Sequence, residues 1–160
     1  MAKSSFDSAQ ICLNGHVVTS HYHDFPQFRK SFCSDCGEKT ITACGNCQAE
    51  IQGSYRDGFS IDYGLPAFCQ ECGSPFPWTE RALAAAADLA EDLDELGPDE
   101  KANLKASLAD LIRSGPRTSL AETRFKRLMS KVRAESYQAM RSILIDVLSE
   151  SVKRSIFGVT

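Results

Sequence analysis

The sequence predicts a small, metal-stabilised β-rich domain over residues 1–78, followed by an all-α helical tail over residues 79–160. Two observations divide the chain in this way. All seven cysteines lie between Cys12 and Cys72, and all three histidines lie in the same part of the chain. From Thr79 onward the composition turns to Ala, Leu, Glu, Lys and Arg with helical spacing. The first part has few apolar positions at a regular period, so we expect metal ions to stabilise its fold.

The composition is typical of a folded, soluble protein. The chain has 42% hydrophobic and 24% charged residues and a formal net charge of -3, unlike a disordered chain. No run approaches the roughly 18 apolar residues of a membrane span. The start MAKSSFDSAQ lacks the apolar core of a secretory signal. We therefore expect a cytoplasmic protein, in which thiols stay reduced and the cysteines do not form a disulfide framework.

The cysteines and one histidine form four closely spaced pairs of metal ligands. These pairs are Cys12 with His16, Cys33 with Cys36, Cys44 with Cys47, and Cys69 with Cys72. Zinc prefers thiolate and imidazole ligands, and paired ligands in tight turns are typical of structural zinc sites. Eight ligands fill two tetrahedral sites, so we expect two structural zinc ions per chain. Cysteines that merely pack, an iron-sulfur cluster and redox-active Cys-x2-Cys pairs remain alternatives.

An internal repeat predicts how the four pairs combine. In each half, a first pair is followed by a polar and aromatic stretch and then by Phe-Cys-x2-Cys-Gly, at residues 32–37 and 68–73. Each half is therefore predicted to be a complete zinc ribbon. The two predicted sites are Cys12, His16, Cys33 and Cys36 (site 1) and Cys44, Cys47, Cys69 and Cys72 (site 2).

Two other pairings remain open. In a cross-brace, the first pair would share an ion with the third pair, and the second pair with the fourth. In the other arrangement, the second and third pairs would form a local site, which leaves Cys12 and His16 to reach Cys69 and Cys72.

The motifs CLNGH, FCSDCGEKTI, CGNC and FCQECGSPFPW occur in this order and are followed by PRTSLAETRFKRL in the helical part. In this order they resemble the bacterial domain-of-unknown-function 2321 family. The resemblance covers nearly the whole chain, and the PFPW and PRT flanks are more specific than the cysteine pairs. It implies tandem zinc-binding pairs before a helical tail, and it supplies no catalytic residue.

No motif in the chain indicates an enzyme. A catalytic zinc keeps an open coordination position, whereas four protein ligands are predicted for each ion here. His21 and His23 are the spare histidines, and Asp24 can orient one of them, but histidine is common in surface loops and no nucleophile lies nearby in sequence. The sequence has no phosphate-binding glycine loop, nucleotide fingerprint or hydrolase elbow.

The charge of the first domain makes nucleic acid an unfavoured partner. Residues 1–78 hold five Lys or Arg and eight Asp or Glu, and phosphate contacts dominate the affinity of nucleic-acid binders. Phe76 and Trp78 are expected to seal the ribbon against the first helix. The other aromatic residues between the ligand pairs are expected in the small core rather than stacked on bases: Tyr22, Phe25, Phe28, Tyr55, Phe59 and Tyr63.

The tail is predicted to form three helices. The first covers residues 80–96 and the second residues 99–113, and each ends near a Gly-Pro pair. The third covers residues 119–156, begins at a capping box of Ser119 and Glu122, and is about 57 Å long if unbroken.

The third predicted helix carries an apolar stripe that two short helices do not cover. The exposed part predicts a homo-oligomer. The interface residues would be Ile143, Leu144, Val147 and Leu148. The alternatives are a core against the chain's own helices and a helix lying flat on a membrane, with Lys153, Arg154 and Phe157 at its end.

Charge is segregated along the tail. Residues 80–100 hold eight acidic residues and one basic residue, and residues 113–133 hold seven basic residues and one acidic residue. These segments are predicted to dock within a subunit or between subunits, or to remain separately solvated.

Together these features predict a non-enzymatic zinc-binding adaptor, which presents tandem zinc ribbons on a self-associating helical tail for protein-protein interaction. One alternative is a nucleic-acid-associated protein that uses the basic helix over residues 113–133. The other is a cross-braced, RING-like adaptor in a protein-modification pathway.

Overall fold

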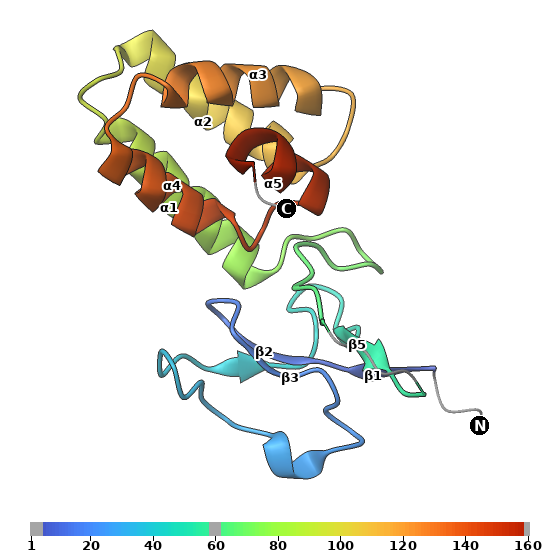
Figure 1. The fold of residues 1–160 in the computed structure, drawn as a ribbon. Coiled ribbons are helices and arrows are strands. Elements are labelled where there is room, and N and C mark those ends of the chain that lie inside the picture. Colours follow the sequence, from blue (N-terminus) through green and yellow to red (C-terminus); the bar gives the residue numbers. More distant parts are fainter. Residues whose placement is uncertain (1–4, 58–61, 159–160) are drawn as a thin grey trace. The chain divides into compact units, whose positions relative to one another are not determined.

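The computed structural model describes residues 5–57 and 62–158 of the chain (Figure 1). The chain forms two compact units, Met1–Thr79 and Glu80–Thr160. The division lies one residue beyond the predicted end of the first domain. All the strands of the described residues lie in the first unit, and five helices follow them along the chain.

Short antiparallel strands form two small sheets in the first unit. β1 (Phe6–Ser8) pairs with β5 (Gln52–Tyr55), and β2 (Gln10–Cys12) lies between β3 (Val17–Thr19) and β4 (Thr40–Ile41). A short 3-10 helix, η1 (Pro26–Phe28), lies in the loop after β3. The strands have only two to four residues each. Sheets this small bury little apolar surface, so the unit needs another source of stability.

The core of the first unit is small and includes Ile11 and Trp78, which are 0% and 2% exposed. Trp78 stacks on the buried Phe76 with ring centroids 4.7 Å apart, and its Nε1 donates to the Pro66 carbonyl at 2.7 Å. Gly15 has a φ of +91°, and a Cβ at this position would lie 3.1 Å from the Trp78 Cβ. Both the backbone conformation and the contact therefore require glycine in the turn between β2 and β3.

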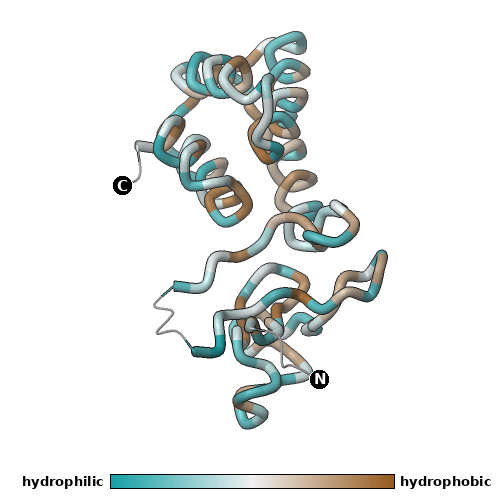
Figure 2. The backbone as a smooth tube through the Cα atoms, turned by 90° about the vertical axis from the view of Figure 1, so that its right-hand side faces the viewer, coloured by the Kyte–Doolittle hydropathy of each residue, from teal (hydrophilic) through white to brown (hydrophobic). Residues whose placement is uncertain are grey.

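The five helices are amphipathic, and two of them have recognisable start signals. They are α1 (Pro77–Glu91), α2 (Pro98–Ile112), α3 (Thr118–Met129), α4 (Ala134–Leu144) and α5 (Glu150–Phe157). α2 begins at a proline, and the Glu100 carboxylate accepts the Gly97 amide at 3.0 Å. In Figure 2 hydrophobic and hydrophilic colours alternate along these helices, as expected where one face of each helix is buried.

The prediction of one helix over residues 119–156 is wrong. This stretch forms α3, α4 and α5, with breaks at residues 130–133 and 145–149 (Figure 1). Because the chain turns back, Phe157 of α5 packs edge to face on the fully buried Phe125 of α3, with ring centroids 5.8 Å apart. Burial of the apolar stripe inside the unit offsets the helical hydrogen bonds lost at the two breaks.

The predicted oligomer interface is part of the core of the second unit. Leu144, Val147 and Leu148 are 0%, 5% and 5% exposed within the single chain, and Ile143 is half-buried. Because of the two breaks, the apolar stripe packs among the chain's own helices. A continuous helix would leave part of the stripe exposed. This burial removes the observation on which the prediction of self-association rests.

The acidic and basic segments of the tail are joined by ion pairs within the chain. Arg133 Nε lies 3.0 Å from a Glu95 carboxylate oxygen, and Lys131 pairs with Glu100. Of the two predicted docking modes, the chain therefore contains the one within a subunit. These pairs are partly exposed and contribute little stability each.

None of the helices in the described ranges is both long enough and apolar enough to cross a membrane.

Candidate metal centres

The first candidate centre lies between the turn after β2 and the turn before β4. It brings together the side chains of Cys12, His16, Cys33 and Cys36, whose donor atoms all lie within 4.8 Å of one another. The Cys12 Sγ lies 3.7 Å from the Cys36 Sγ, and the His16 Nδ1 lies 3.5 Å from the Cys12 Sγ and 3.6 Å from the Cys33 Sγ. Cys12 and Cys33 are buried, whereas His16 and Cys36 lie at the surface.

The second candidate centre repeats this arrangement with four thiols. Cys44, Cys47, Cys69 and Cys72 meet the same 4.8 Å limit, and again the first cysteine of each pair is buried and the second exposed. The sulfur atoms of Cys44 and Cys72 lie 3.7 Å apart, as do those of Cys47 and Cys69.

These separations can be compared with the edges of a zinc tetrahedron. Zinc binds thiolate sulfur at about 2.3 Å and imidazole nitrogen at about 2.0–2.1 Å, so tetrahedral geometry places two sulfurs about 3.8 Å apart and a nitrogen about 3.5 Å from a sulfur. The observed edges of 3.5 to 3.7 Å fit one ion per cluster. They are too long for a disulfide bond, at about 2.05 Å. An iron-sulfur cluster places several iron atoms between its thiolates and needs a wider spacing.

Three of the four ligand pairs lie in the same kind of turn. In each turn, the amide of the first cysteine donates at 2.8 Å to the carbonyl five residues later (from Cys33 to Glu38, from Cys44 to Ala49, and from Cys69 to Ser74). The residue after the second cysteine has a left-handed backbone, with φ of 71° at Gly37, 64° at Gln48 and 72° at Gly73. Glycine adopts this conformation without strain, so the Phe-Cys-x2-Cys-Gly motif is a local signal for the turn.

The first pair lies instead in the hairpin that joins β2 to β3. The Cys12 amide donates to the His16 carbonyl at 3.0 Å, and the His16 amide donates to the Cys12 Sγ at 3.3 Å. This hairpin turns the Nδ1 atom of His16 toward the sulfurs of Cys12 and Cys33. The sequence identifies the histidine as a ligand candidate but does not say which ring nitrogen faces the site.

Two asparagines contact the candidate centres in equivalent ways. Asn14 Nδ2 donates to the Cys36 Sγ and Asn46 Nδ2 donates to the Cys72 Sγ, each at 3.5 Å. Amide donors of this kind stabilise the negative charge of a thiolate and orient it for a metal. This role is not predicted from the sequence, although an asparagine lies in the first ligand pair of each half, in CLNGH and in CGNC.

The donor atoms are grouped as the internal repeat predicts. The first ligand pair lies with the second, and the third with the fourth. Neither the cross-brace nor the local site of Cys33, Cys36, Cys44 and Cys47 corresponds to the groups that these side chains form. Each centre therefore joins two pairs across a long link, of 16 residues in the first centre and 21 in the second, and not across the seven residues between the second and third pairs.

A third group of possible ligands, Asp7, His21 and Asp24, is better explained as a loop brace. The Asp7 carboxylate accepts the amides of Ser8, His23 and Asp24 and lies near Arg56, which also pairs with Asp24. Burial alone would raise the pKa of Asp7, but these amides and the Arg56 guanidinium lower the pKa below its ordinary value. The guanidinium pairs with both carboxylates and three amides donate to the Asp7 oxygens, so we assign no metal to this group.

His23 has a similar structural role. Its Nε2 lies 3.2 Å from a carboxylate oxygen of Glu50, which also accepts the Ser8 hydroxyl at 2.6 Å. His21 Nδ1 is buried and has no hydrogen-bond partner in the described part of the chain. Neither histidine lies in the two cysteine-containing clusters.

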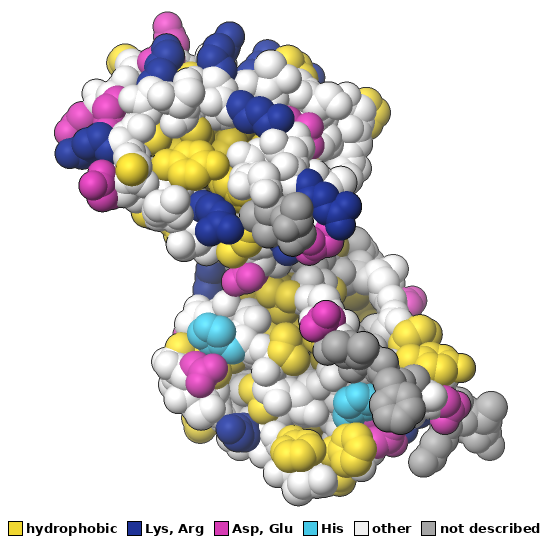
Figure 3. Space-filling view, viewed as in Figure 1, with side chains coloured by type: hydrophobic (Ala, Val, Ile, Leu, Met, Phe, Trp, Pro, Cys, Tyr) yellow, Lys and Arg dark blue, Asp and Glu magenta, His cyan; other side chains and the backbone are white. Residues whose placement is uncertain are grey.

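The aromatic residues between the ligand pairs are more exposed than predicted from the sequence. Phe25, Phe28 and Tyr55 are 44%, 53% and 43% exposed, so they are not core residues. The small sheets leave no second layer to cover them. Tyr63 is partly buried, Tyr22 is intermediate, and Phe59 lies outside the described residues. Figure 3 shows hydrophobic side chains at the surface of the first unit.

A comparison with known protein families identifies the family of this chain. The family model of DUF2321, described as "Uncharacterized protein conserved in bacteria", matches residues 5–156, and the chain belongs to this family. The resemblance inferred from the cysteine motifs is thus confirmed. No curated protein and no solved structure matches the chain.

Proposed function

We propose that this member of the DUF2321 family binds two structural zinc ions, one at each four-donor cluster, and that the zinc-stabilised unit is a docking module for other proteins. The observation that carries the proposal is the spacing of the donor atoms. Three donor distances of 3.5 to 3.7 Å in the first cluster and two of 3.7 Å in the second fit a tetrahedral zinc ion. Each ion would close one ribbon, over residues 12–36 and 44–72.

The proposed function is non-enzymatic. Four protein ligands complete the tetrahedral coordination of each zinc ion, so no position remains for a substrate or an activated water molecule. When bound, zinc would cross-link the short strands and turns whose own core is small. This is the ordinary role of a structural zinc ion in a domain of this size.

The distribution of exposed apolar side chains supports docking by the first unit. Among the described residues, the exposed large hydrophobic side chains of this unit are Phe6, Val17, Phe25, Phe28, Phe32 and Tyr55, whereas the second unit exposes only Leu120. Aromatic residues are enriched at protein interfaces, and clusters of them on a surface mark interaction sites. The helical unit buries its apolar stripe and has less surface of this kind to offer.

The ion pairs of the basic segment favour a protein partner over nucleic acid. Lys131, Arg133 and Arg117 face the carboxylates of Glu100, Glu95 and Asp110. A phosphate backbone would have to compete with these carboxylates. We therefore propose no nucleic-acid function and no self-association through the helical unit.

Elemental analysis and chelation test the zinc proposal. Purified protein should contain two zinc ions per chain, and a chelator should unfold the first unit while the helical circular-dichroism signal of the second unit persists. One zinc ion per chain, bound iron, or a first unit that stays folded in the chelator would contradict the proposal.

Replacement of exposed aromatics tests the docking proposal separately. Phe25 and Phe28 pack on each other at the surface, with ring centroids 6.1 Å apart. The variant with both residues changed to Ser should keep both zinc ions but should no longer cross-link to the partners of the wild-type protein. The Leu120→Ser variant should still cross-link to those partners. Unchanged cross-linking by the double variant would contradict a docking role for this surface.

A further inference from the structure

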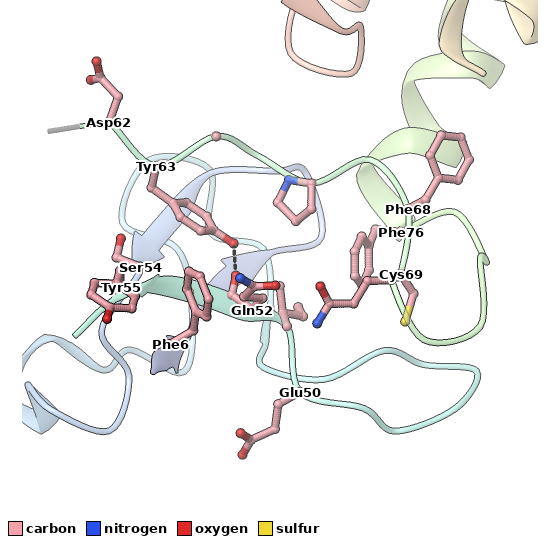
Figure 4. A pocket seen from close by; sticks show the side chains of 15 residues that line it. Phe6, Glu50, Gln52, Ser54, Tyr55, Asp62, Tyr63, Phe68, Cys69 and Phe76 are labelled. Atoms are coloured by element: carbon pink, nitrogen blue, oxygen red, sulfur yellow. Dashed lines mark hydrogen bonds between the residues drawn. The ribbon is translucent and has the colours of Figure 1, made fainter. Parts of the chain in front are cut away.

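A cavity of about 390 Å³ lies against β5 in the first unit (Figure 4). Five of the described residues that line it are aromatic, namely Phe6, Tyr55, Tyr63, Phe68 and Phe76. Tyr63 lies across β5, where its hydroxyl donates to the Gln52 carbonyl at 2.5 Å. Burial raises the pKa of Tyr63 to about 12, so the phenol is neutral at physiological pH. The volume lies in the range of pockets that bind small ligands.

The charged groups around this cavity have one sign. Of the described residues that line it, Glu50 and Asp62 carry carboxylates and none is Lys, Arg or His. Figure 4 shows Asp62 beyond Tyr63 and Glu50 on the other side of β5. The hydrogen bond from Ser8 is the main reason that the pKa of Glu50 is below its ordinary value, so Glu50 is ionised at neutral pH. Cys69 also lines the cavity, and a zinc ion held by four thiolates carries excess negative charge.

We propose that this cavity binds the cationic side chain of a Lys or Arg residue in a partner protein. The faces of aromatic rings attract cations, and the carboxylates and the thiolate centre add to this attraction. The same groups repel an anionic side chain. The inference rests on the proposed docking function of the zinc-stabilised unit and names the chemistry of the residue that it recognises.

A second cavity favours a peptide over a free amine. This cavity of about 220 Å³ shares five lining residues with the first, namely Phe6, Glu50, Ile51, Gln52 and Gln70. The two cavities therefore adjoin at β5, and the second is also lined by the ion pair of Asp7 and Arg56. A free organic cation needs only the first cavity, whereas an extended peptide can place its side chain there and its main chain along the second cavity.

Titration with peptides of matched length tests the proposal. Zinc-loaded, isotope-labelled protein is titrated with pools of short acetylated peptides whose flanking positions are randomised and whose central residue is Lys, Arg, norleucine or Glu. We expect the Lys or Arg pool to shift the amide resonances of Gly53, Tyr63 and Gln70 with an affinity about tenfold above that of the norleucine pool. The Glu pool should not bind, and n-butylammonium should bind more weakly than the Lys pool.

Charge-neutralising variants provide the matched control. The double change Glu50→Gln and Asp62→Asn keeps the size of both side chains. It should weaken the binding of the Lys and Arg pools by about fivefold or more without changing the binding of the norleucine pool. Asp57→Asn removes an exposed carboxylate of the same unit that does not line either cavity and should have no effect. Every variant is checked for two bound zinc ions.

The outcomes separate the two proposals. If both zinc ions are bound and the norleucine pool binds as tightly as the Lys and Arg pools, or no pool binds, the cavity proposal is wrong while the zinc proposal stands. If n-butylammonium binds as tightly as the Lys pool, the ligand is a free cation and the peptide assignment is overturned. Loss of zinc from the wild-type protein would instead contradict the proposed function itself.

Discussion

Replacing Gly37 with Ala is expected to weaken zinc binding at the first centre through backbone strain alone. Gly37 has a φ of +71°, and no heavy atom lies within 4 Å of the Cβ that alanine would add. A left-handed conformation costs an L-residue roughly 1–2 kcal/mol, and alanine returns about 0.4–1 kcal/mol by restricting the unfolded chain. The net cost is about 1 kcal/mol. Because zinc binding and folding are coupled in such a unit, the apparent zinc affinity should fall about fivefold.

The equivalent position in the third ligand pair, directly after Cys47, supplies the reverse experiment. Gln48 has a φ of 64°, and its exposed side chain donates a hydrogen bond to the Gly45 carbonyl at 3.3 Å. Gln48→Gly relieves the strain but increases the entropy of the unfolded chain, so zinc affinity at the second centre should stay within about twofold of the wild type.

Competition with a chromophoric zinc chelator measures both variants. If Gly37→Ala binds zinc as tightly as the wild type, or if Gln48→Gly loses as much affinity as Gly37→Ala, the left-handed turn is not what holds these ligands. Thermal unfolding of the zinc-loaded proteins should rank the variants in the same order.

Three further replacements follow from the structure. Gly53→Ala places a Cβ 2.2 Å from the Ser20 carbonyl oxygen, so we expect a loss of more than about 3 kcal/mol and weaker zinc binding at both centres; a zinc titration like that of the wild type would contradict this. Asn46→Ala removes the amide donor to the Cys72 Sγ and should speed zinc release from the second centre by about fivefold while leaving the first unchanged, as stopped-flow chelation can measure. Val147→Asp buries an unpaired charge at a position that is 5% exposed and should lower the free energy of unfolding of the helical unit by several kcal/mol in denaturant titrations. A folded variant that only changes its sedimentation from dimer to monomer would restore the interface prediction.

The candidate centres could be predicted from the sequence because their signals are local. A Cys-x2-Cys pair followed by glycine specifies its own turn, and the repeat relates the two halves of the chain. Two parts of the centres could not be read in this way. The contacts of Asn14 and Asn46 with thiols 22 and 26 residues away depend on how the turns meet. The choice of Nδ1 at His16 depends on the register of a hairpin.

The helical tail shows where local signals fail. Residues 119–156 contain neither glycine nor proline, so nothing in their propensities ends a helix at Met129 or Leu144. The breaks are determined by tertiary packing, because three short helices can bury Phe125, Leu144 and Val152 together. The exposure of Phe25 and Phe28 has a related cause. Composition says that aromatic residues tend to be buried, but the two small sheets provide no surface to cover these rings.

Native mass spectrometry of the double variant Cys33→Ser and Cys36→Ser tests the central claim most directly. The wild-type chain should carry two zinc ions. The variant should carry one, with the thiols of Cys44, Cys47, Cys69 and Cys72 protected from alkylation and Cys12 reactive. A variant that retains two zinc ions, or that loses protection at Cys69 and Cys72 while its helical unit stays folded, would contradict two independent zinc centres.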